Sequence, residues 1–297
     1  MKKKSANHSA NHSAIVLDIE MHSRKTKLFQ ACLIVLFSVI ALLYLVPLLW
    51  IFLSAFKSTE EFLSVKPTLF PKEISLSKMW DVWQRGKLLS KYGNTIIMSL
   101  GNIVFTLLFC GLAGYSLSRI KPTGTKLVMS VVFWSMMMPG NLAMVPLFIN
   151  FTKGIFGIKL MNSFLPIWLM SAANAFYVLI FKSFFDGIPN SLIEAARIDG
   201  ASEFTIFMRI VLPLSRPAVF TISIFTFTGS WGSFLWPSLI LSDEKQVLGM
   251  AIVKQAQYML VDEYFMLLLF AILPPVLFFI FFQKYIMDGY TIGGVKG

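Results

Sequence analysis

Long uncharged segments alternate with short charged ones along almost the whole chain. Six of these segments contain no Asp, Glu, Lys or Arg. A helix needs about 20 mainly apolar residues to cross roughly 30 Å of hydrocarbon, and backbone amides in lipid must find partners within their own segment. The pattern therefore predicts an all-α membrane protein with six transmembrane helices, at residues 29–56, 92–117, 127–152, 160–181, 217–242 and 264–282.

The composition agrees with this pattern. Apolar residues make up 56% of the 297 residues, charged residues only 14%, and the mean hydropathy is +0.71. A soluble core of this size would not bury so much apolar surface, so the excess is expected to face lipid. The net charge of +11 does not indicate nucleic-acid binding, because the basic residues are dispersed between the apolar segments. Cys32 and Cys110 lie inside apolar segments and predict no disulfide and no metal site.

The distribution of basic residues predicts the orientation. With both termini in the cytoplasm, the inner segments hold 15 Lys and Arg and the outer segments hold 11, of which seven lie in residues 57–91. We therefore expect a multi-pass protein of the bacterial cell membrane with cytoplasmic N- and C-termini. Residues 1–27 are polar, contain a tandem Ala-Asn-His-Ser repeat and are predicted to be a disordered cytoplasmic tail. Residues 28–297 are predicted to form the six-span domain, ending in a cytoplasmic tail at residues 283–297.

The apolar segments contain prolines but no Asp, Glu, His, Lys or Arg. Proton and ion relays need such side chains, so an ion-coupled transporter or a proton pump is not expected. Prolines favour kinks, either for ordinary helix packing or for a pathway wall that changes shape. A pathway here would be lined by neutral polar and aromatic groups, which suit an uncharged, hydroxyl-rich solute. The alternative for each group is a role in helix packing; the candidates are Asn141, Asn174, Thr228, Ser230, Trp231 and Trp236.

The loop at residues 186–216, between the fourth and fifth apolar segments, is charged yet strongly patterned. Ser191 and Glu194 fit a capping box at the start of a short helix. Gly200, after Asp199, is expected to end that helix. A second helix is predicted over residues 202–211, with Pro213 ending it. Spacing alone leaves two interpretations open: a capped pair of surface helices, or a knob on which a partner docks.

The residues of this loop resemble the EAA loop of ABC import permeases. The pattern is Glu-Ala-Ala, three residues, Gly, nine residues, Ile, one residue and Leu-Pro, which is matched without departure by Glu194, Ala195, Ala196, Gly200, Ile210, Leu212 and Pro213. The string from Glu194 to Ser202, EAARIDGAS, resembles the carbohydrate-uptake branch, which includes the smaller permease subunit of maltose importers. Phe56-Lys57-Ser58 and the chain end from Phe282 resemble that branch as well, although Gly294 stands where the family usually has Ala.

This resemblance implies a type I ABC importer permease fold with a cytoplasmic coupling helix. It implies that Glu194 contacts an ATPase, that Ala195 and Ala196 pack closely against it, and that Asp199 and Gly200 form the bend. It also implies that the tail Gly294, Val295, Lys296 and Gly297 reaches the ATPase interface. The partners it implies are an ATPase subunit dimer, a second, paralogous permease and an extracytoplasmic sugar-binding protein, all acting at the lipid bilayer.

No phosphate-binding Gly-x-x-x-x-Gly-Lys-Ser/Thr motif, HExxH or Gly-x-Ser-x-Gly occurs in the sequence. We therefore expect a transporter subunit without catalytic residues, metal or cofactor, whose ATP and Mg²⁺ bind in the partner ATPase. The expected solute is a sugar or oligosaccharide, and the alternative is a non-carbohydrate solute such as a polyol or glycerol phosphate. An intramembrane enzyme lacks a polar cluster at membrane depth, and a scaffold or receptor subunit would need neither broken spans nor a docking knob.

Overall fold

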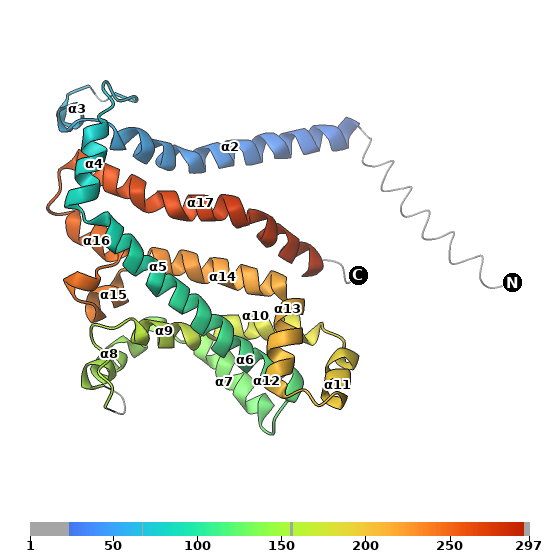
Figure 1. Ribbon diagram of the computed structural model, residues 1–297. Helices are drawn as coiled ribbons and strands as arrows, with labels where there is room; N and C mark the ends of the chain where they lie inside the picture. The colour runs from blue at the N-terminus through green and yellow to red at the C-terminus, as the bar shows by residue number, and fades with distance from the viewer. Residues whose placement is uncertain (1–23, 67, 155–156, 294–297) are drawn as a thin grey trace. The chain divides into compact units, whose positions relative to one another are not determined.

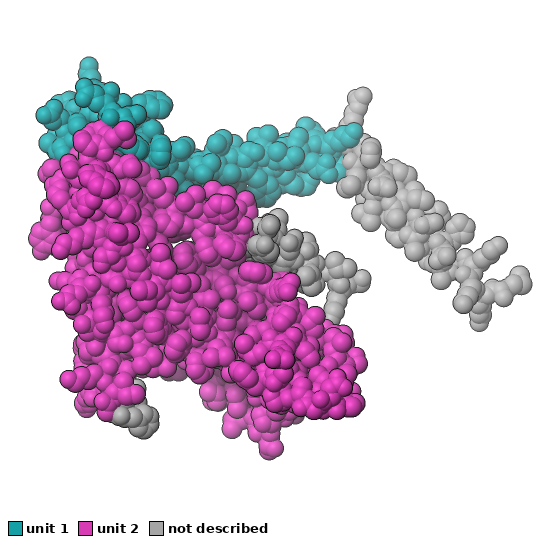
Figure 2. Space-filling model, viewed as in Figure 1, with its two compact units in different colours: residues 1–74 teal, residues 75–297 magenta. Residues whose placement is uncertain are grey.

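The computed structural model describes residues 24–66, 68–154 and 157–293, and side chains only as far as residue 283. The chain divides into two compact units, Met1–Ile74 and Ser75–Gly297, which Figure 2 colours separately. Residues 1–23 of the predicted tail lie outside the described residues, whereas residues 24–27 belong to the first helix.

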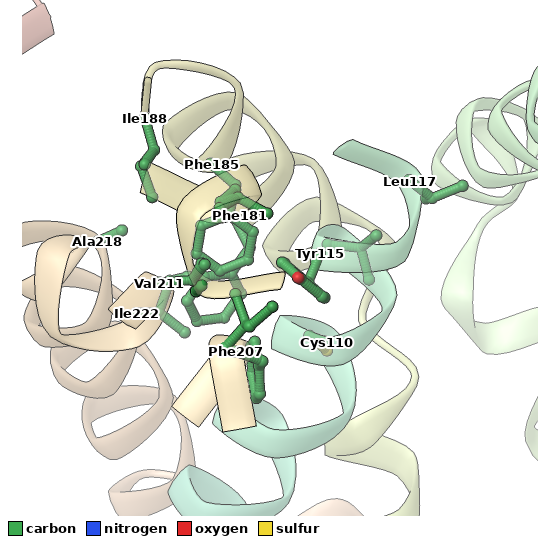
Figure 3. Packing of buried hydrophobic residues seen from close by; sticks show 14 residues of the cluster. Cys110, Tyr115, Leu117, Phe181, Phe185, Ile188, Phe207, Val211, Ala218 and Ile222 are labelled. Atoms are coloured by element: carbon green, nitrogen blue, oxygen red, sulfur yellow. The ribbon is translucent and has the colours of Figure 1, made fainter. Parts of the chain in front are cut away.

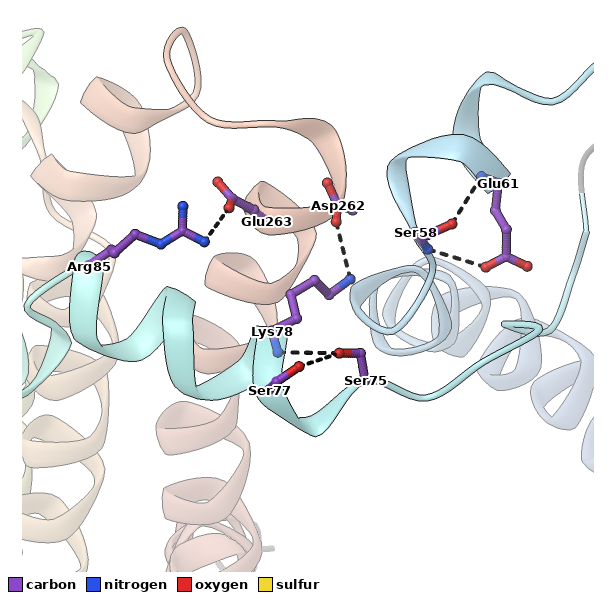
Figure 4. A network of polar contacts seen from close by, with 8 residues as sticks. All are labelled: Ser58, Glu61, Ser75, Ser77, Lys78, Arg85, Asp262 and Glu263. Carbon is purple, nitrogen blue, oxygen red and sulfur yellow. Dashed lines mark hydrogen bonds and ion pairs between the residues drawn. The ribbon is translucent and has the colours of Figure 1, made fainter.

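The first unit contains one long helix and one short one. Helix α2, Arg24–Ala55, is 32 residues long and apolar enough to span a membrane. Lys57 follows it and is buried, with its ammonium 4.4 Å from the centroid of the Trp50 ring. Helix α3, Thr59–Leu63, begins with a capping box between Ser58 and Glu61, drawn in Figure 4. The turn at residues 56–58 is therefore a packed structural element.

The second unit begins with the amphipathic helix α4, Leu76–Arg85, which is tied to the start of α17, Val261–Gly293, by two ion pairs. Lys78 lies 3.5 Å from Asp262, and Arg85 lies 2.7 Å from Glu263 (Figure 4). The two acids lie in the first turn of α17, where the helix dipole also favours negative charge. These contacts attach α4 to the end of a spanning helix.

A continuous helix over Leu88–Ile120 forms the middle of the second unit. It is built from α5, Leu88–Phe105, α6, Gly111–Tyr115, and two π-helical turns, η1, Thr106–Cys110, and η2, Ser116–Ile120. Glycines let other helices approach it closely: a Cβ at Gly101 would lie 2.1 Å from the Trp168 ring, and one at Gly114 would lie 2.8 Å from Cβ of Phe181. Small residues at such crossings are typical of membrane helix packing.

The predicted spans at residues 127–152 and 160–181 are bent helix pairs. Helix α7, Thr125–Met137, is followed by η3, Gly140–Ala143, and α8, Met144–Lys153, across a 97° bend. Helix α9, Leu165–Ala172, and α10, Ala175–Asp186, meet at 48°. The break before α10 leaves carbonyl groups without helical partners, and Thr106 donates to the carbonyl of Ser171 there at 3.1 Å. Side chains of the continuous helix thus stabilise the break.

The predicted fifth span at residues 217–242 is not one helix. Helix α14, Arg216–Trp231, ends at Gly232, and α15, Leu235–Ile240, is a separate turn of helix. Helix α14 also makes an 85° bend with the segment Glu203–Leu214 that precedes it. After α15 come η5, Asp243–Lys245, α16, Leu248–Gln255, and α17, which continues through Pro274 and Pro275. Helix α14 packs between α5 and α17 (Figure 1).

Within the described residues, three helices are long and apolar enough to cross a membrane: Thr26–Ala55, Leu88–Ile120 and Val261–Gln283. Three bent pairs, one of them formed by Glu203–Leu214 and Arg216–Trp231, pass the same test of length and composition, which gives up to six spans. The all-α membrane architecture predicted from the sequence is confirmed. The segments at residues 127–152, 160–181 and 217–242 each contain a break, in keeping with the kinks expected from their prolines.

Candidate functional site

The loop at residues 186–216 forms two short helices, as predicted, joined at Gly200. Helix α11, Asn190–Ile198, ends with Asp199 as its C-cap, and Gly200 has a φ of 78°. The amide of Gly200 donates to the carbonyl of Arg197 and that of Ala201 to Ala196, both at 3.0 Å. This is a Schellman motif, in which a left-handed residue lets the chain reverse while pairing the last carbonyls. Gly200 therefore fixes the direction in which the second helix leaves.

The predicted capping box between Ser191 and Glu194 is wrong. The N-cap of α11 is Pro189, without a side-chain cap bond, so the helix starts earlier than expected and Ser191 lies within its first turn. The start is held from outside instead, because the guanidinium of Arg119 donates to the Asn190 side chain and to the carbonyls of Phe185 and Ile188. Among the described residues, no hydrogen bond or ion pair engages the exposed carboxylate of Glu194.

One face of α11 packs inward. Ile193 and Ala196, three residues apart on one helix face, are buried in a cluster with Phe181, Phe185 and Phe207. Figure 3 shows the three phenylalanines of this cluster. The opposite face carries Glu194 and Ala195, both exposed. Of the two alanines predicted to pack against a partner, Ala196 instead packs within this chain, and only Ala195 remains available.

The second helix runs further than predicted. It consists of α12, Glu203–Ile206, the π-helical turn η4, Phe207–Val211, and α13, Leu212–Leu214. Ser202 caps its start by accepting from the amide of Thr205 at 3.2 Å. Pro213 does not end it, because Leu214 still belongs to α13 and the C-cap is Ser215. Ile210 and Leu212 are half-buried and pack against the same cluster as Ile193, whereas Pro213 is exposed.

A polar bridge fixes the two helices to the membrane domain. The Glu203 carboxylate accepts from Nε of Arg197 at 2.7 Å and from the Tyr115 hydroxyl at 2.6 Å. The hydrogen bond from Arg197 lowers the pKa of Glu203, and the bond to Glu203 raises the pKa of Arg197. Sequence reasoning missed this bridge, since an aromatic residue 88 positions before an acid shows no recognisable spacing.

A second brace joins the ends of α10 and of the continuous helix. Ser118 donates to Asp186 at 2.6 Å, and Lys182 forms an ion pair with the other oxygen of Asp186 at 2.6 Å. With Arg119, these contacts hold residues 186–190 against the end of the helix Leu88–Ile120. A movement of α11 would therefore be transmitted to that helix.

The loop also exposes apolar side chains. Ile198 is 86% exposed and Phe204 is 55% exposed. Leu192 and Met208 are exposed on the same two helices. We call these four residues the apolar knob surface. Exposed apolar side chains that lie together on a protein surface often mark an interaction site.

The candidate pathway residues have different environments. Ser230 is buried and accepts from the Asn102 amide at 2.7 Å, and Trp231 is buried and donates to the carbonyl of Ala271 at 3.0 Å. Both join helices in this structure. Thr228 is exposed on α14 and donates back to the carbonyl of Ile224.

The remaining candidates lie at helix breaks. Asn141 is exposed in the turn η3, and Asn174 caps α10 by accepting from the amide of Tyr177 at 3.1 Å. Trp236 is half-buried in α15, against Phe151. A pathway lining therefore stays a prediction for Asn141, Asn174, Thr228 and Trp236, whereas Ser230 and Trp231 would have to leave their partners first.

The predicted tail contact at Gly294, Val295, Lys296 and Gly297 lies outside the described residues. In the part of the chain that the structure describes, no group of three or more His, Cys, Asp or Glu side chains is arranged to hold a metal ion. The described contacts of the loop at residues 186–216 are thus apolar packing, hydrogen bonds and ion pairs, and they include no group of catalytic side chains.

Comparison with known proteins places the chain in a family. Residues 107–290 match the family described as binding-protein-dependent transport system inner membrane component. The chain is 32% identical over 285 residues to the arabinooligosaccharides transport system permease protein AraQ of Bacillus subtilis, covering 93% of this chain and 99% of that protein. It is 30% identical to the diacetylchitobiose uptake system permease protein NgcG of Streptomyces coelicolor, covering 91% of this chain and 89% of that protein.

The fold is shared with a solved transporter. A chain of a bacterial ABC transporter involved in the import of the acidic polysaccharide alginate superposes with a TM-score of 0.76 at 24% identity, covering 89% of this chain and 98% of that one. This protein therefore belongs to the binding-protein-dependent transport system inner membrane components. It is a permease subunit of an ABC importer, and a transporter subunit rather than an enzyme.

Proposed function

We propose that this chain forms half of the pathway of a sugar or oligosaccharide importer and couples that pathway to ATP hydrolysis in a partner subunit. The observation that supports the coupling role most is helix α11, whose Glu194 has no ion-pair or hydrogen-bond partner among the described residues and whose Ile198 is almost fully exposed. Its other face is packed into the membrane domain. Such a helix can transmit a push from an ATPase to the spans that it touches.

The proposed assembly contains a second, paralogous permease, an ATPase dimer that binds ATP and Mg²⁺, and an extracytoplasmic sugar-binding protein. In the proposed topology, α11 and both termini lie on the cytoplasmic side of the bacterial cell membrane. The sugar assignment is supported by the relatives, whose printed names include an arabinooligosaccharide permease and a diacetylchitobiose permease. One further relative, named as a probable starch degradation products transport system permease protein, supports the same solute class.

Purification of the full-length chain from its native membrane tests this proposal. We expect an ATPase and a second permease to co-purify, and we expect radiolabelled oligosaccharide uptake to stop in a Glu194→Lys variant that still reaches the membrane. The matched control is Glu73→Lys, an exposed acid on a different loop; its uptake should persist. Absence of an ATPase from the purified protein, or normal uptake by Glu194→Lys, would contradict the coupling role.

A further inference from the structure

A cavity lies between the start of α5 and the segment that joins α15 to α16. It is separate from the loop at residues 186–216. It has a volume of about 660 Å³ and is open on one side. Its walls include Arg85, Lys87, Lys91 and Lys254 together with Asp243 and Glu244. The volume lies within the range of small-molecule sites, roughly 300–1,000 Å³. In the proposed orientation it opens on the extracytoplasmic side.

Lys91 is the informative residue of this cavity. It is only 7% exposed, yet among the described residues no acid or carbonyl forms a hydrogen bond or ion pair with its ammonium group. A buried charge without a counter-ion is unfavourable, so such groups are normally paired. Two other cations of the cavity are engaged: Arg85 pairs with Glu263, and Lys254 pairs with Asp243. Lys87 has no ion pair among the described residues, but its side chain is exposed to solvent. Lys91 is therefore the buried cation of this cavity that has no hydrogen-bond or ion-pair partner among the described residues.

The backbone adds to the positive potential. Lys87 is the N-cap of α5, with a φ of 48° and no side-chain cap bond. The first amides of an 18-residue helix thus begin beside the cavity without a capping side chain. The walls are held in place as well, because Thr95 accepts from the amide of Leu248 at 2.9 Å and Asn94 donates to the carbonyl of Gln246 at 3.1 Å. The cavity is a preformed site for a negatively charged group.

The acids at its rim restrict which anion fits. Asp243 and Glu244 are exposed carboxylates that repel a polyanion such as a polyphosphate but accept hydrogen bonds from hydroxyl groups. A neutral sugar would satisfy the acids and leave Lys91 unpaired. A lone carboxylate side chain from a docked protein would fill only a small part of about 660 Å³. The combination fits a ligand that carries both a carboxylate and several hydroxyls.

We propose that this cavity binds the uronic acid unit of an acidic oligosaccharide, with its carboxylate on Lys91 and the α5 amides and its hydroxyls on Asp243 and Glu244. The inference rests on the proposed sugar-import function and assigns the solute to an acidic class, in place of the uncharged solute that the neutral pathway candidates suggest. It gives the chain an extracytoplasmic sugar contact that is separate from the neutral groups predicted to line the pathway.

Ligand-observed NMR on the full-length chain, purified in detergent with its membrane and ATPase partners but without a binding protein, tests the proposal. The probes are sodium glucuronate, glucose and sodium acetate at equal ionic strength. We expect saturation transfer to glucuronate and far weaker transfer to glucose and to acetate. In Lys91→Met, glucuronate binding should weaken by roughly tenfold or more, since a charge-assisted hydrogen bond is lost. The matched control is Lys153→Met, an exposed lysine outside the cavity.

Should Lys91→Met fail to fold, Lys87→Asn replaces it, because Asn tolerates the positive φ while removing a cation of the cavity. Equal transfer to glucose or acetate would overturn the proposal, and so would unchanged glucuronate binding in both lysine variants. In a separate assay with the binding protein added, loss of its docking in Lys91→Met, together with no glucuronate binding to the unmodified chain, would overturn the proposal and assign the cavity to a protein partner. The proposed importer function fails separately, through the absence of an ATPase from the purified protein.

Discussion

Arg197 and Glu203 form an ion pair across the turn at Gly200, with 2.7 Å between Nε and Oε1. The pair joins the end of α11 to the start of α12, and Tyr115 attaches both to the membrane domain through the second oxygen of Glu203. Three features therefore hold the loop at residues 186–216 in place: the left-handed Gly200, this ion pair and the buried apolar face of α11.

Replacement of Gly200 tests the role of the turn. Nothing lies within 4 Å of a Cβ placed there, so the cost is conformational and not steric. Gly200→Val should destabilise the loop by about 1–2 kcal/mol, the cost of a left-handed backbone for a residue with a Cβ. We expect uptake to fall sharply while the amount of protein in the membrane stays near normal. Gly229→Ala on α14, where the space is also open and φ is negative, is the control and should transport normally.

Removal of the Tyr115 hydroxyl tests the link between the loop and the membrane domain. Tyr115→Phe keeps the ring in its aromatic cluster with Phe185 and Phe207 but deletes the bond to Glu203. We expect a loss of about 1 kcal/mol in stability and more ATP hydrolysis per solute molecule transported. Tyr258→Phe, on an exposed residue, should change neither. An unchanged ratio of hydrolysis to uptake in Tyr115→Phe would argue against this link.

The pH dependence of stability tests the electrostatic part of the bridge. The pKa of Glu203 lies below its ordinary value of 4.5, so the folded state favours its charged form. Its contribution to stability is then fully present above pH 4.5 and is lost as the pH falls through the lower pKa of the folded state. The difference in melting temperature between the wild type and Glu203→Gln should be positive at neutral pH and shrink toward zero as the pH falls below 4.5. The effect is expected to be small, because both side chains are partly exposed. A difference that does not change with pH would contradict the charged bridge.

The close helix crossing at Gly101 gives a stability prediction. A methyl group there would overlap the Trp168 ring at 2.1 Å, in a wall where the indole also donates to the carbonyl of Met98. Gly101→Ala should therefore cost at least about 1–3 kcal/mol, as for other overpacked sites, and should lower the yield of folded protein. Gly93→Ala, on the same helix with open space around it, should fold normally and serves as the control.

The sequence predicted the class of fold because lipid imposes long uncharged segments, and those segments are visible without any structure. It predicted the turn at Gly200, whose signal is a local left-handed residue after a helix. Its prolines predicted kinks in the spans, but not the 97° size of the bend after Met137 or the end of α14 at Gly232, since hydropathy does not change at either break. The capping box failed for a related reason: Arg119, far away in sequence, sets the start of α11.

Among the candidate site residues, too, some could be recognised from the sequence and others could not. Glu194 could be found from its motif, and its exposed carboxylate is consistent with a partner contact. Ala196 carries the same motif yet faces inward, because helical periodicity puts it on the face of Ile193. Ser230 and Trp231 are of the residue types expected to line a pathway, but their side chains form hydrogen bonds with neighbouring helices. Composition identifies polar groups at membrane depth without showing whether a partner already satisfies them.

The central claim is that α11 and the apolar knob surface contact an ATPase, and photocrosslinking from position 198 tests it most directly. Ile198 and Tyr258 are almost equally exposed, at 86% and 85%, so a photoreactive amino acid at position 258 is a matched control. The account predicts that light joins position 198 to the ATPase subunit in native membranes and that position 258 gives no such product. Equal or absent ATPase crosslinks from the two positions would contradict it.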